Sequence, residues 1–559
     1  MGKFSIDFIN LTSDFESLSE NKRKITKMNI KGIIGCGLLT ATTFLSFGQY
    51  KTVEEIDAKY LNWYNQGLDG DKVPGAGVER AYNDLLKSLD SKKTIVVAVL
   101  DGGVEVEHED LKDNIWINAD EIPGNGIDDD KNGYIDDIHG WNFLGNSKGE
   151  NINEENLEFV RILKVLKPKY EGKSEESISK ENMKEYELYK EISALYDEEM
   201  KGIDGQLAQI VPVKNVYDKL AKEIGKEDFT VEDVKAIDND DLAKEKAMAE
   251  KVIENGFGPK KCKKYYDYFS KQKEYYLNLD FDGRAIIGDD INNINDKNYG
   301  NPDVGGPDAF HGTFVGGIIG AVRNNGKGVN GIATNVRIMG VRAVPNGDEY
   351  DKDIALGIRY AVDNGANIIN MSFGKKYSPN KHMVDEAIKY AAEKGVLLVA
   401  AAGNDHLNVE EHIHYPIDDL DNGFKPKNYI SVGASSIKYD ADLPGTFSNY
   451  GKKSVDLFAP GVDIVSTSPG SMYDKANGTS FACPVVSGVA ALVWSYYPEL
   501  TAEQLKKILL KTVVKSKKIK THKPGDKPED KSVKFGKLSK TGGLVDAYKA
   551  LILAKKIAG

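Results

Sequence analysis

The chain has 559 residues, of which 40% are hydrophobic and 29% are charged, and its formal net charge is −12. This length and apolar content predict one large domain with additions or several smaller domains, and they argue against a disordered chain. The negative charge argues against nucleic-acid binding, which needs Lys and Arg clustered on a basic face. We read the lysine-rich run 515–523 as solvated surface.

The N-terminal region predicts export. Residues 28–48 have a basic start, an apolar run and small residues near their end, as in a secretory signal peptide cut before Gln49. Residues 1–27 are then an upstream extension. A membrane anchor is the alternative, but the apolar run 32–47 is shorter than the roughly 20 residues of a spanning helix. We therefore expect a periplasmic or extracellular protein with no membrane span in the mature chain.

From residue 94 onward, β-branched runs alternate with helical patterns. Such runs are typical of parallel strands buried on both faces, and they occur at 94–101, 336–344, 366–374, 395–404 and 429–436. They predict an α/β fold with a doubly wound, mainly parallel sheet and helices on both faces. The main domain would comprise 94–145 and 277–559, preceded by an N-terminal extension, 49–93.

Asp101 directly follows the first of these runs and precedes two glycines. A carboxylate at the carboxyl end of a buried strand lies where such sheets bind ligands, and there it could orient a histidine. An Asp that caps the next turn is the alternative reading.

The stretch "DDDKNGYIDD", residues 128–137, predicts a structural calcium site. Carboxylates and amides at alternate positions, a glycine turn and a carbonyl match most of a calcium loop, and the expected ligands are Asp128, Asp130, Asn132, Tyr134 and Asp136. His139 stands where a bidentate Glu belongs, so Asp137 or a more distant carboxylate would complete the shell. The alternative is an Asp-rich turn without an ion.

Residues 146–276, rich in Glu, Lys and Tyr, interrupt the alternation of strands and helices. Leu188, Ile192 and Leu195 recur at helical spacing, which predicts an amphipathic helix. We interpret the segment as a helical insertion, either a packed decoration or a lid or partner-binding element.

Three further positions complete a possible catalytic set. His311 opens "HGTFVGGIIGAV" at or near a helix start, Asn404 ends the strand run 395–404, and Ser480 precedes Pro484 in a predicted first helical turn. The N–H of Ser480 and the side chain of Asn404 could therefore stabilise a developing oxyanion. A lone histidine would more often be structural, and Asn404 alone could be a turn residue.

The motifs "VVAVLDGG", "HGTFVGGIIGA", "NMSFG", "VAAAGN" and "NGTSFACPVVSGVAAL" resemble, in this order, those of the subtilisin-like serine peptidases. The resemblance implies a secreted endopeptidase that uses no organic cofactor. By this resemblance Ser480 attacks the scissile carbonyl, His311 takes and returns the proton, and Asp101 holds the imidazole. Asn404 and the Ser480 N–H would bind the oxyanion.

The resemblance also implies a substrate cleft for peptides or proteins. Its linings correspond to two short segments, Ser372, Phe373 and Gly374, and Ala401, Ala402 and Gly403. An extended peptide would pair as an added strand beside the first segment. The chain departs from the family's usual residues at Gly102, Phe314, Phe481 and Cys483, and none of these changes removes a catalytic atom.

A protein of another class could use the same scaffold, namely a non-catalytic or latent exported binding protein with the helical insertion in the cleft. The intact set of Asp101, His311, Ser480 and Asn404 argues against it. Oligomeric state and side-chain preference stay open.

Overall fold

The structure is a computed structural model that describes residues 50–527 and 529–559. The predicted signal peptide and the extension before it lie outside the described residues. The chain divides into two compact units. The smaller one contains Gly202–Phe269, and the larger one contains the described residues up to Lys201 together with Ser270–Gly559.

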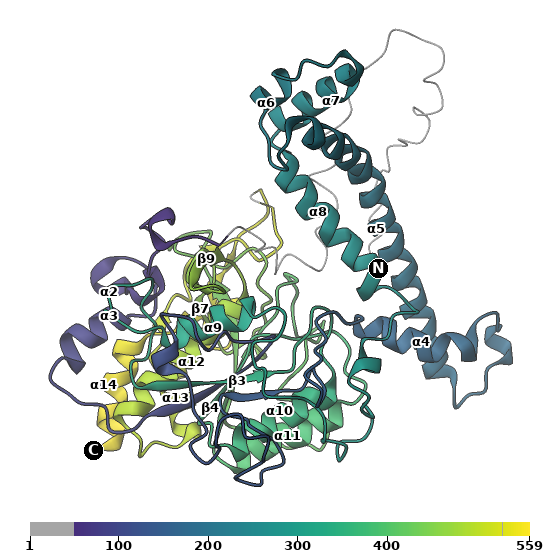
Figure 1. The fold of residues 1–559 in the computed structure, drawn as a ribbon. Coiled ribbons are helices and arrows are strands. Elements are labelled where there is room, and N and C mark those ends of the chain that lie inside the picture. Colours follow the sequence, from purple (N-terminus) through teal and green to yellow (C-terminus); the bar gives the residue numbers. More distant parts are fainter. Residues whose placement is uncertain (1–49, 528) are drawn as a thin grey trace. The chain divides into compact units, whose positions relative to one another are not determined.

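The larger unit is built on a nine-stranded sheet of order β10-β13-β7-β6-β5-β4-β1-β3-β2 (Figure 1). Five of its strands are those predicted from sequence, and they pair in parallel: β1 (Ile95–Asp101), β3 (Val336–Arg342), β4 (Ile368–Met371), β5 (Leu397–Ala401) and β6 (Tyr429–Ser435). The prediction of a doubly wound, mainly parallel α/β sheet is confirmed.

The remaining strands are two to five residues long, too short to show a clear period in the sequence. In the main sheet these are β2 (Gly140–Asn142), β7 (Leu457–Pro460), β10 (Val514–Lys515) and β13 (Gly543–Leu544), with β10 and β13 antiparallel. Two small antiparallel sheets are formed by β8 (Ile464–Ser468) with β9 (Met472–Ala476), and by β11 (Lys520–Thr521) with β12 (Val533–Lys534).

Helices pack on both faces of the sheet, and alternation along β1 shows why both faces are apolar. Val97 and Val99 face a core with α9 (Phe310–Gly320), α12 (Thr479–Tyr496), α13 (Ala502–Thr512) and α14 (Ala547–Ala558). Ala98 and Leu100 face the opposite core, with α10 (Asp351–Asp363) and α11 (Lys381–Glu393). Each fully buried valine or leucine stabilises the fold by about 1.5–3 kcal/mol.

Helix α12 is long and apolar enough to span a membrane by composition alone. All 18 of its residues are buried inside the larger unit, as in a core helix. The burial explains its composition, because neither side of the helix meets water.

The glycines of α9 allow this helix to approach its neighbours closely. A Cβ at Gly320 would lie 2.6 Å from Val336 of β3, and one at Gly317 would lie 2.2 Å from the Thr467 hydroxyl of β8. These contacts explain residues that are otherwise unfavourable in a helix by about 1 kcal/mol each. They also set the position of His311 at the start of α9.

The described part of the N-terminal extension packs into the core of the larger unit. It contains the short helices α2 (Leu68–Asp71) and α3 (Val78–Arg80). Trp63 and Tyr64 are fully buried, and they donate hydrogen bonds to the carbonyls of Asp463 and Asn330, at 3.0 and 2.9 Å. This segment is therefore integral to the larger unit.

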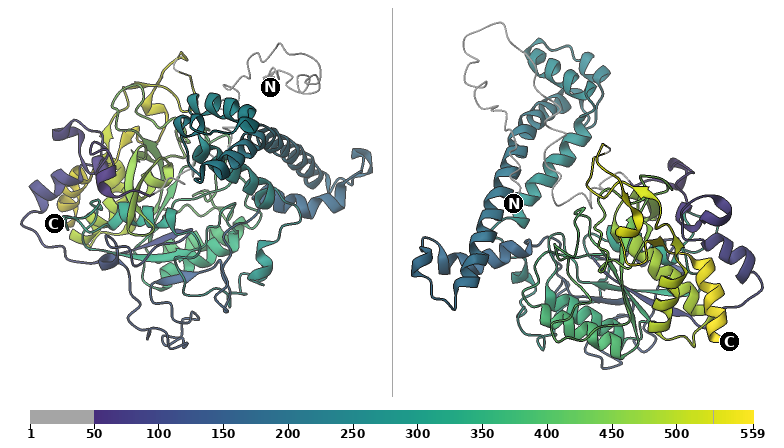
Figure 2. Two further views of the ribbon diagram at one scale, coloured as in Figure 1. Left: turned by 45° about the horizontal axis from the view of Figure 1, so that its top comes forward. Right: turned by 180° about the vertical axis from the view of Figure 1, so that it is seen from behind.

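Residues 146–276 contain the helices α4 (Glu158–Tyr170), α5 (Met183–Ile224), α6 (Val231–Lys235), α7 (Ala243–Glu254) and α8 (Pro259–Lys271). We call residues 146–276 the helical segment. Within the smaller unit α8 runs alongside α5 (Figures 1 and 2), and the Tyr217 hydroxyl donates to the Phe257 carbonyl at 2.6 Å. The first part of the helical segment, including α4, belongs to the larger unit.

Candidate functional site

The carboxyl ends of three adjacent strands bring the predicted residues to one edge of the sheet. Asp101 ends β1, Ser372 directly follows β4, and Asn404 lies three residues beyond β5, in the sheet order β5-β4-β1. The crevice beyond the carboxyl ends of parallel strands is where such sheets bind ligands. The strand order therefore concentrates polar side chains at one place.

Asp101 and His311 form a direct pair although 210 positions separate them. The distance between His311 Nδ1 and Asp101 Oδ1 is 2.6 Å, and the Asp101 side chain is 2% exposed while that of His311 is 15% exposed. The N–H of Gly102 donates to the same carboxylate oxygen at 2.7 Å. A carboxylate at Nδ1 holds the proton on that nitrogen, which leaves Nε2 as the basic one.

Ser480 lies in the first turn of α12, next to the end of β4. Its hydroxyl donates to the Ser372 carbonyl at 3.0 Å, and the Ser372 hydroxyl donates to the Ser480 carbonyl at 2.7 Å. The imidazole of His311 packs against Phe481, with ring centroids 5.5 Å apart. The serine and the histidine are therefore brought to neighbouring positions.

Asn404 is oriented by Thr479, the first residue of α12. Its side-chain oxygen accepts the Thr479 N–H at 2.8 Å and the Thr479 hydroxyl at 3.0 Å. The amide NH₂ then points away from Thr479. The N–H groups in the first turn of a helix have no intrahelical acceptors and lie at the positive end of its dipole. Asn404 and Ser480 can thus supply two donors to one anion.

The two predicted linings follow neighbouring strands. Ser372–Gly374 comes after β4, and Ala401–Gly403 ends and follows β5. The N–H of Gly403 donates to the Thr479 hydroxyl at 3.2 Å, and the N–H of Ala402 donates to the Val432 carbonyl at 3.0 Å. The structure places both segments beside the start of α12.

His414, which sequence reasoning missed, packs against both segments. A Cβ at Gly374 would lie 2.3 Å from its Nε2, and one at Gly403 would lie 2.9 Å from its ring. Burial lowers the pKa of His414, which favours the neutral imidazole, and Asp405 at 4.0 Å partly offsets this effect. Nothing in the local sequence around His414 predicts the contact.

The cysteine in this region is unsuited to nucleophilic chemistry. Cys483 is fully buried, and its thiol contacts the Val399 carbonyl and the Asn370 side chain, both at 3.2 Å. Burial raises the pKa of Cys483 to about 12, so the thiolate is not formed at neutral pH. Ser480 is the better nucleophile here.

The acidic loop brings together two of the predicted calcium ligands. Carboxylate oxygens of Glu121, Asp128 and Asp130 all lie within 4.8 Å of one another. The Asn132 amide donates to Asp130 at 3.0 Å, and Tyr134 lies two residues further along. Asp136 is engaged elsewhere, because its carboxylate accepts the N–H groups of Asn125 and Gly126, at 3.2 and 2.9 Å.

Glu121 lies outside the loop motif, so its participation had no local signal in the sequence. Its carboxylate accepts the N–H groups of Asp129 and Asp130, at 2.8 and 3.1 Å, and that of Asp136 at 3.1 Å. The three clustered carboxylates of Glu121, Asp128 and Asp130 suit a hard, oxygen-preferring cation.

Comparison with known proteins identifies a family and relatives that match part of this chain. Residues 92–536 match the Subtilase family. The Thermophilic serine proteinase of Bacillus sp. (strain AK1) is 40% identical over 221 residues, which cover 39% of this chain and 49% of that protein. The Major intracellular serine protease of Bacillus subtilis (strain 168) is 38% identical over 215 residues, covering 37% of this chain and 63% of that protein.

Among solved structures, one described as proteases from Pseudoalteromonas arctica PAMC 21717 is 28% identical with a TM-score of 0.37. It covers 48% of this chain and 84% of that chain. The match to the first curated relative spans about half of its length.

Proposed function

Because the chain belongs to the subtilase family, we propose that it is a serine endopeptidase that hydrolyses peptide bonds through Asp101, His311 and Ser480. The observation that carries this proposal is the 2.6 Å contact between Asp101 and His311. It lies at the sheet edge where α12 begins, and Ser480 is the second residue of that helix. A nucleophile, a base and an orienting carboxylate thus come from three distant parts of the chain.

In the proposed reaction the Ser480 hydroxyl attacks the scissile carbonyl carbon while His311 Nε2 accepts its proton. The carbonyl oxygen becomes an anion, which the Asn404 NH₂ and the Ser480 N–H stabilise. His311 then protonates the leaving amine, the C–N bond breaks, and an acyl-enzyme remains. Water, deprotonated by His311, attacks the ester carbonyl carbon. The bond between this carbon and the Ser480 oxygen then breaks, His311 returns the proton to that oxygen, and the carboxylic acid product leaves.

The proposed substrates are extended or unfolded peptides. The main chain of Ser372–Gly374 follows β4 and would pair with an added strand, a mode that makes little demand on sequence. Gly374 and Gly403 carry no side chain, and His414 packs closely against both positions. These features favour recognition of the peptide main chain.

Two further properties belong to the proposal. Export rests on residues 28–48 alone, because this part of the sequence has the pattern of a signal peptide. Structural calcium rests on Asp128 and Asp130, to which the clustering adds Glu121. When bound, the cation would offset the mutual repulsion of the carboxylates and hold the loop folded.

A fluorophosphonate probe on the purified full chain tests the central proposal. We expect covalent modification of Ser480, mapped by peptide mass spectrometry, and no modification of the Ser480→Ala variant. A folded wild-type chain that stays unlabelled would instead support a non-catalytic or latent binding protein.

A further inference from the structure

The proposed substrate-pairing segment, Ser372–Gly374, is anchored at both ends. At its start, reciprocal hydrogen bonds of 2.7 and 3.0 Å join Ser372 and Ser480. At its end, Lys375 pairs with Tyr415 through two main-chain hydrogen bonds of 3.1 and 2.9 Å. The position of this backbone relative to the nucleophile therefore depends on how Lys375 is held.

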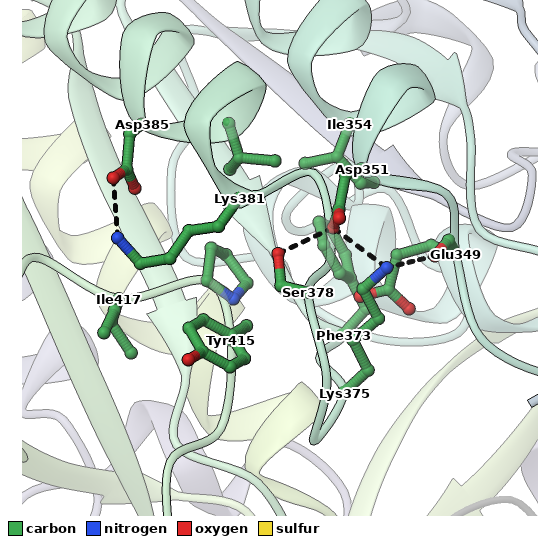
Figure 3. A pocket seen from close by; sticks show the side chains of 12 residues that line it. Glu349, Asp351, Ile354, Phe373, Lys375, Ser378, Lys381, Asp385, Tyr415 and Ile417 are labelled. Carbon is green, nitrogen blue, oxygen red and sulfur yellow. Dashed lines mark hydrogen bonds and ion pairs between the residues drawn. The ribbon is translucent and has the colours of Figure 1, made fainter. Parts of the chain in front are cut away.

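The side chain of Lys375 is directed into the protein, and it is 2% exposed. Its ammonium contacts Glu158 Oε2 at 2.7 Å, Asp351 Oδ1 at 2.9 Å and the Glu349 carbonyl at 2.7 Å. Figure 3 shows the ammonium between Asp351 and Glu349. Glu158 and the Glu349 carbonyl accept hydrogen bonds from the ammonium and Asp351 forms an ion pair with it, so three groups from different parts of the chain hold the side chain in one position.

Glu158, the partner from the helical segment, is itself fixed. It lies in the first turn of α4, its carboxylate pairs with Arg161 at 2.5 Å, and its N–H donates to Asp348 at 2.7 Å. Arg161 also donates to the Glu349 carbonyl at 3.0 Å and stacks over the Tyr350 ring at 4.0 Å. Glu158, at the start of α4, thus connects the helical segment to the Lys375 ammonium through buried charges.

The hollow beside these charges does not serve as a substrate pocket. Its volume is about 10 Å³, close to the minimum that holds one water and too small for a peptide side chain. A buried ion pair adds little net stability compared with an apolar replacement, but it defines geometry strictly, because each charge requires its partner. Positioning is therefore the role that this cluster can perform.

We propose that Lys375 is a positioning residue through which Glu158 of the helical segment holds Ser372–Gly374 in register for pairing with an extended substrate. This inference rests on the proposed function. Lys375 does not touch the reacting atoms, so its loss should weaken the binding of long substrates more than the reactivity of Ser480.

The test compares two substrates on the full chain. Fluorescein-labelled casein, an unfolded protein, requires strand pairing as well as the proposed catalytic residues, whereas p-nitrophenyl acetate requires the catalytic residues but is too small to pair as a strand. In Lys375→Met we expect kcat/KM for casein to fall at least about tenfold, mainly through KM, and turnover of the ester to change by less than about threefold. Lys375→Arg, which keeps the charge, should recover part of the casein activity.

Lys352 offers a matched control, because it is also a buried lysine in this part of the larger unit. Its ammonium binds the Asp289 carboxylate at 2.7 Å and the Asp290 carbonyl at 2.8 Å, which are different acceptors from those of Lys375. Lys352→Met should lower the melting temperature. It should leave unchanged the casein-to-ester ratio, by which we mean kcat/KM for casein divided by the turnover of the ester. An equal change of the ratio in both variants would overturn the positioning role.

An unchanged ratio in folded Lys375→Met also overturns the proposal. If this variant does not fold, Glu158→Gln is tested in its place by the same comparison of casein and ester hydrolysis, because this substitution removes the charge with little change of shape. A wild-type chain that hydrolyses neither substrate and is not labelled at Ser480 contradicts the proposed function itself. The two failures are therefore distinguishable.

Discussion

The side-chain oxygen of Asn404 accepts both the N–H and the hydroxyl of Thr479, at 2.8 and 3.0 Å. Because a planar amide carries its NH₂ opposite its oxygen, this contact directs the donor of Asn404 away from Thr479. Thr479 also accepts the Gly403 N–H, so one residue at the start of α12 orients both Asn404 and the lining segment before it.

Asn404→Ala should lower kcat by about 10²–10³, the loss known for removal of one oxyanion donor in subtilisin. The amide matters once the carbonyl oxygen becomes an anion, so KM should change little. Steady-state kinetics on one peptide substrate measures both constants. Thr479→Val, which loses one of the two contacts to Asn404, should show a smaller loss of kcat, and an Asn404→Ala effect confined to KM would contradict the assignment.

Ser480→Ala should abolish peptide hydrolysis and leave the melting temperature nearly unchanged. In subtilisin the equivalent change costs about 10⁶ in kcat, and we expect a loss of that order here. Activity is measured after separation from contaminating proteases, with circular dichroism as the check of folding. Activity within about tenfold of wild type would remove Ser480 from the reaction.

Calcium should raise the melting temperature of the inactive Ser480→Ala chain. A ligand that binds only the folded state stabilises it by about 2.7 kcal/mol at a hundredfold excess over Kd. Melting curves with calcium and with chelator measure the shift. It should disappear in Asp128→Asn with Asp130→Asn, and it should shrink in Glu121→Gln.

The control for the calcium experiment is Asp113→Asn, an exposed carboxylate outside the loop. This variant should keep the full calcium shift. A shift that persists without Asp128 and Asp130 would place the cation elsewhere, and equal midpoints with calcium and chelator would contradict a structural calcium site.

Glu349 makes the stability of the chain depend on pH. Burial raises its pKa from 4.5 to about 8, so between these values the folded state keeps a proton that the unfolded state has lost. The free energy of unfolding therefore falls as the pH rises through this window, by at most about 1.4 kcal/mol per pH unit. Glu349→Gln removes this slope.

Denaturant unfolding of the Ser480→Ala chain, with and without Glu349→Gln, measures the effect at pH 5 and pH 8. Glu349→Gln should increase the free energy of unfolding more at pH 8 than at pH 5. The control is Glu54→Gln, a substitution at an exposed position. It should change the free energy of unfolding by the same amount at pH 5 and at pH 8. If the effect of Glu349→Gln on the free energy of unfolding depended on pH no more than that of Glu54→Gln, a raised pKa at Glu349 would be contradicted.

Much of the fold was predictable because its central strands are buried on both faces. Continuous β-branched runs marked β1, β3, β4, β5 and β6, and their ends placed Asp101 at the end of β1 and Asn404 beyond β5. The short strands β2, β10 and β13 carried no such signal, since two or three residues show no period and their pairing is set by neighbours distant in sequence.

By itself the sequence determined the α/β class and the chemical identity of Asp101, His311, Asn404 and Ser480, because local patterns specify strand ends and helix starts. Only the tertiary structure decided that β5, β4 and β1 lie side by side, and that Glu121 joins Asp128 and Asp130. It also decided that Glu158 reaches Lys375, 217 positions away. Such contacts join segments that are far apart in the sequence, so they depend on how the strands and helices pack. A buried charge needs a partner, and local sequence does not show which residue will lie close enough to provide it.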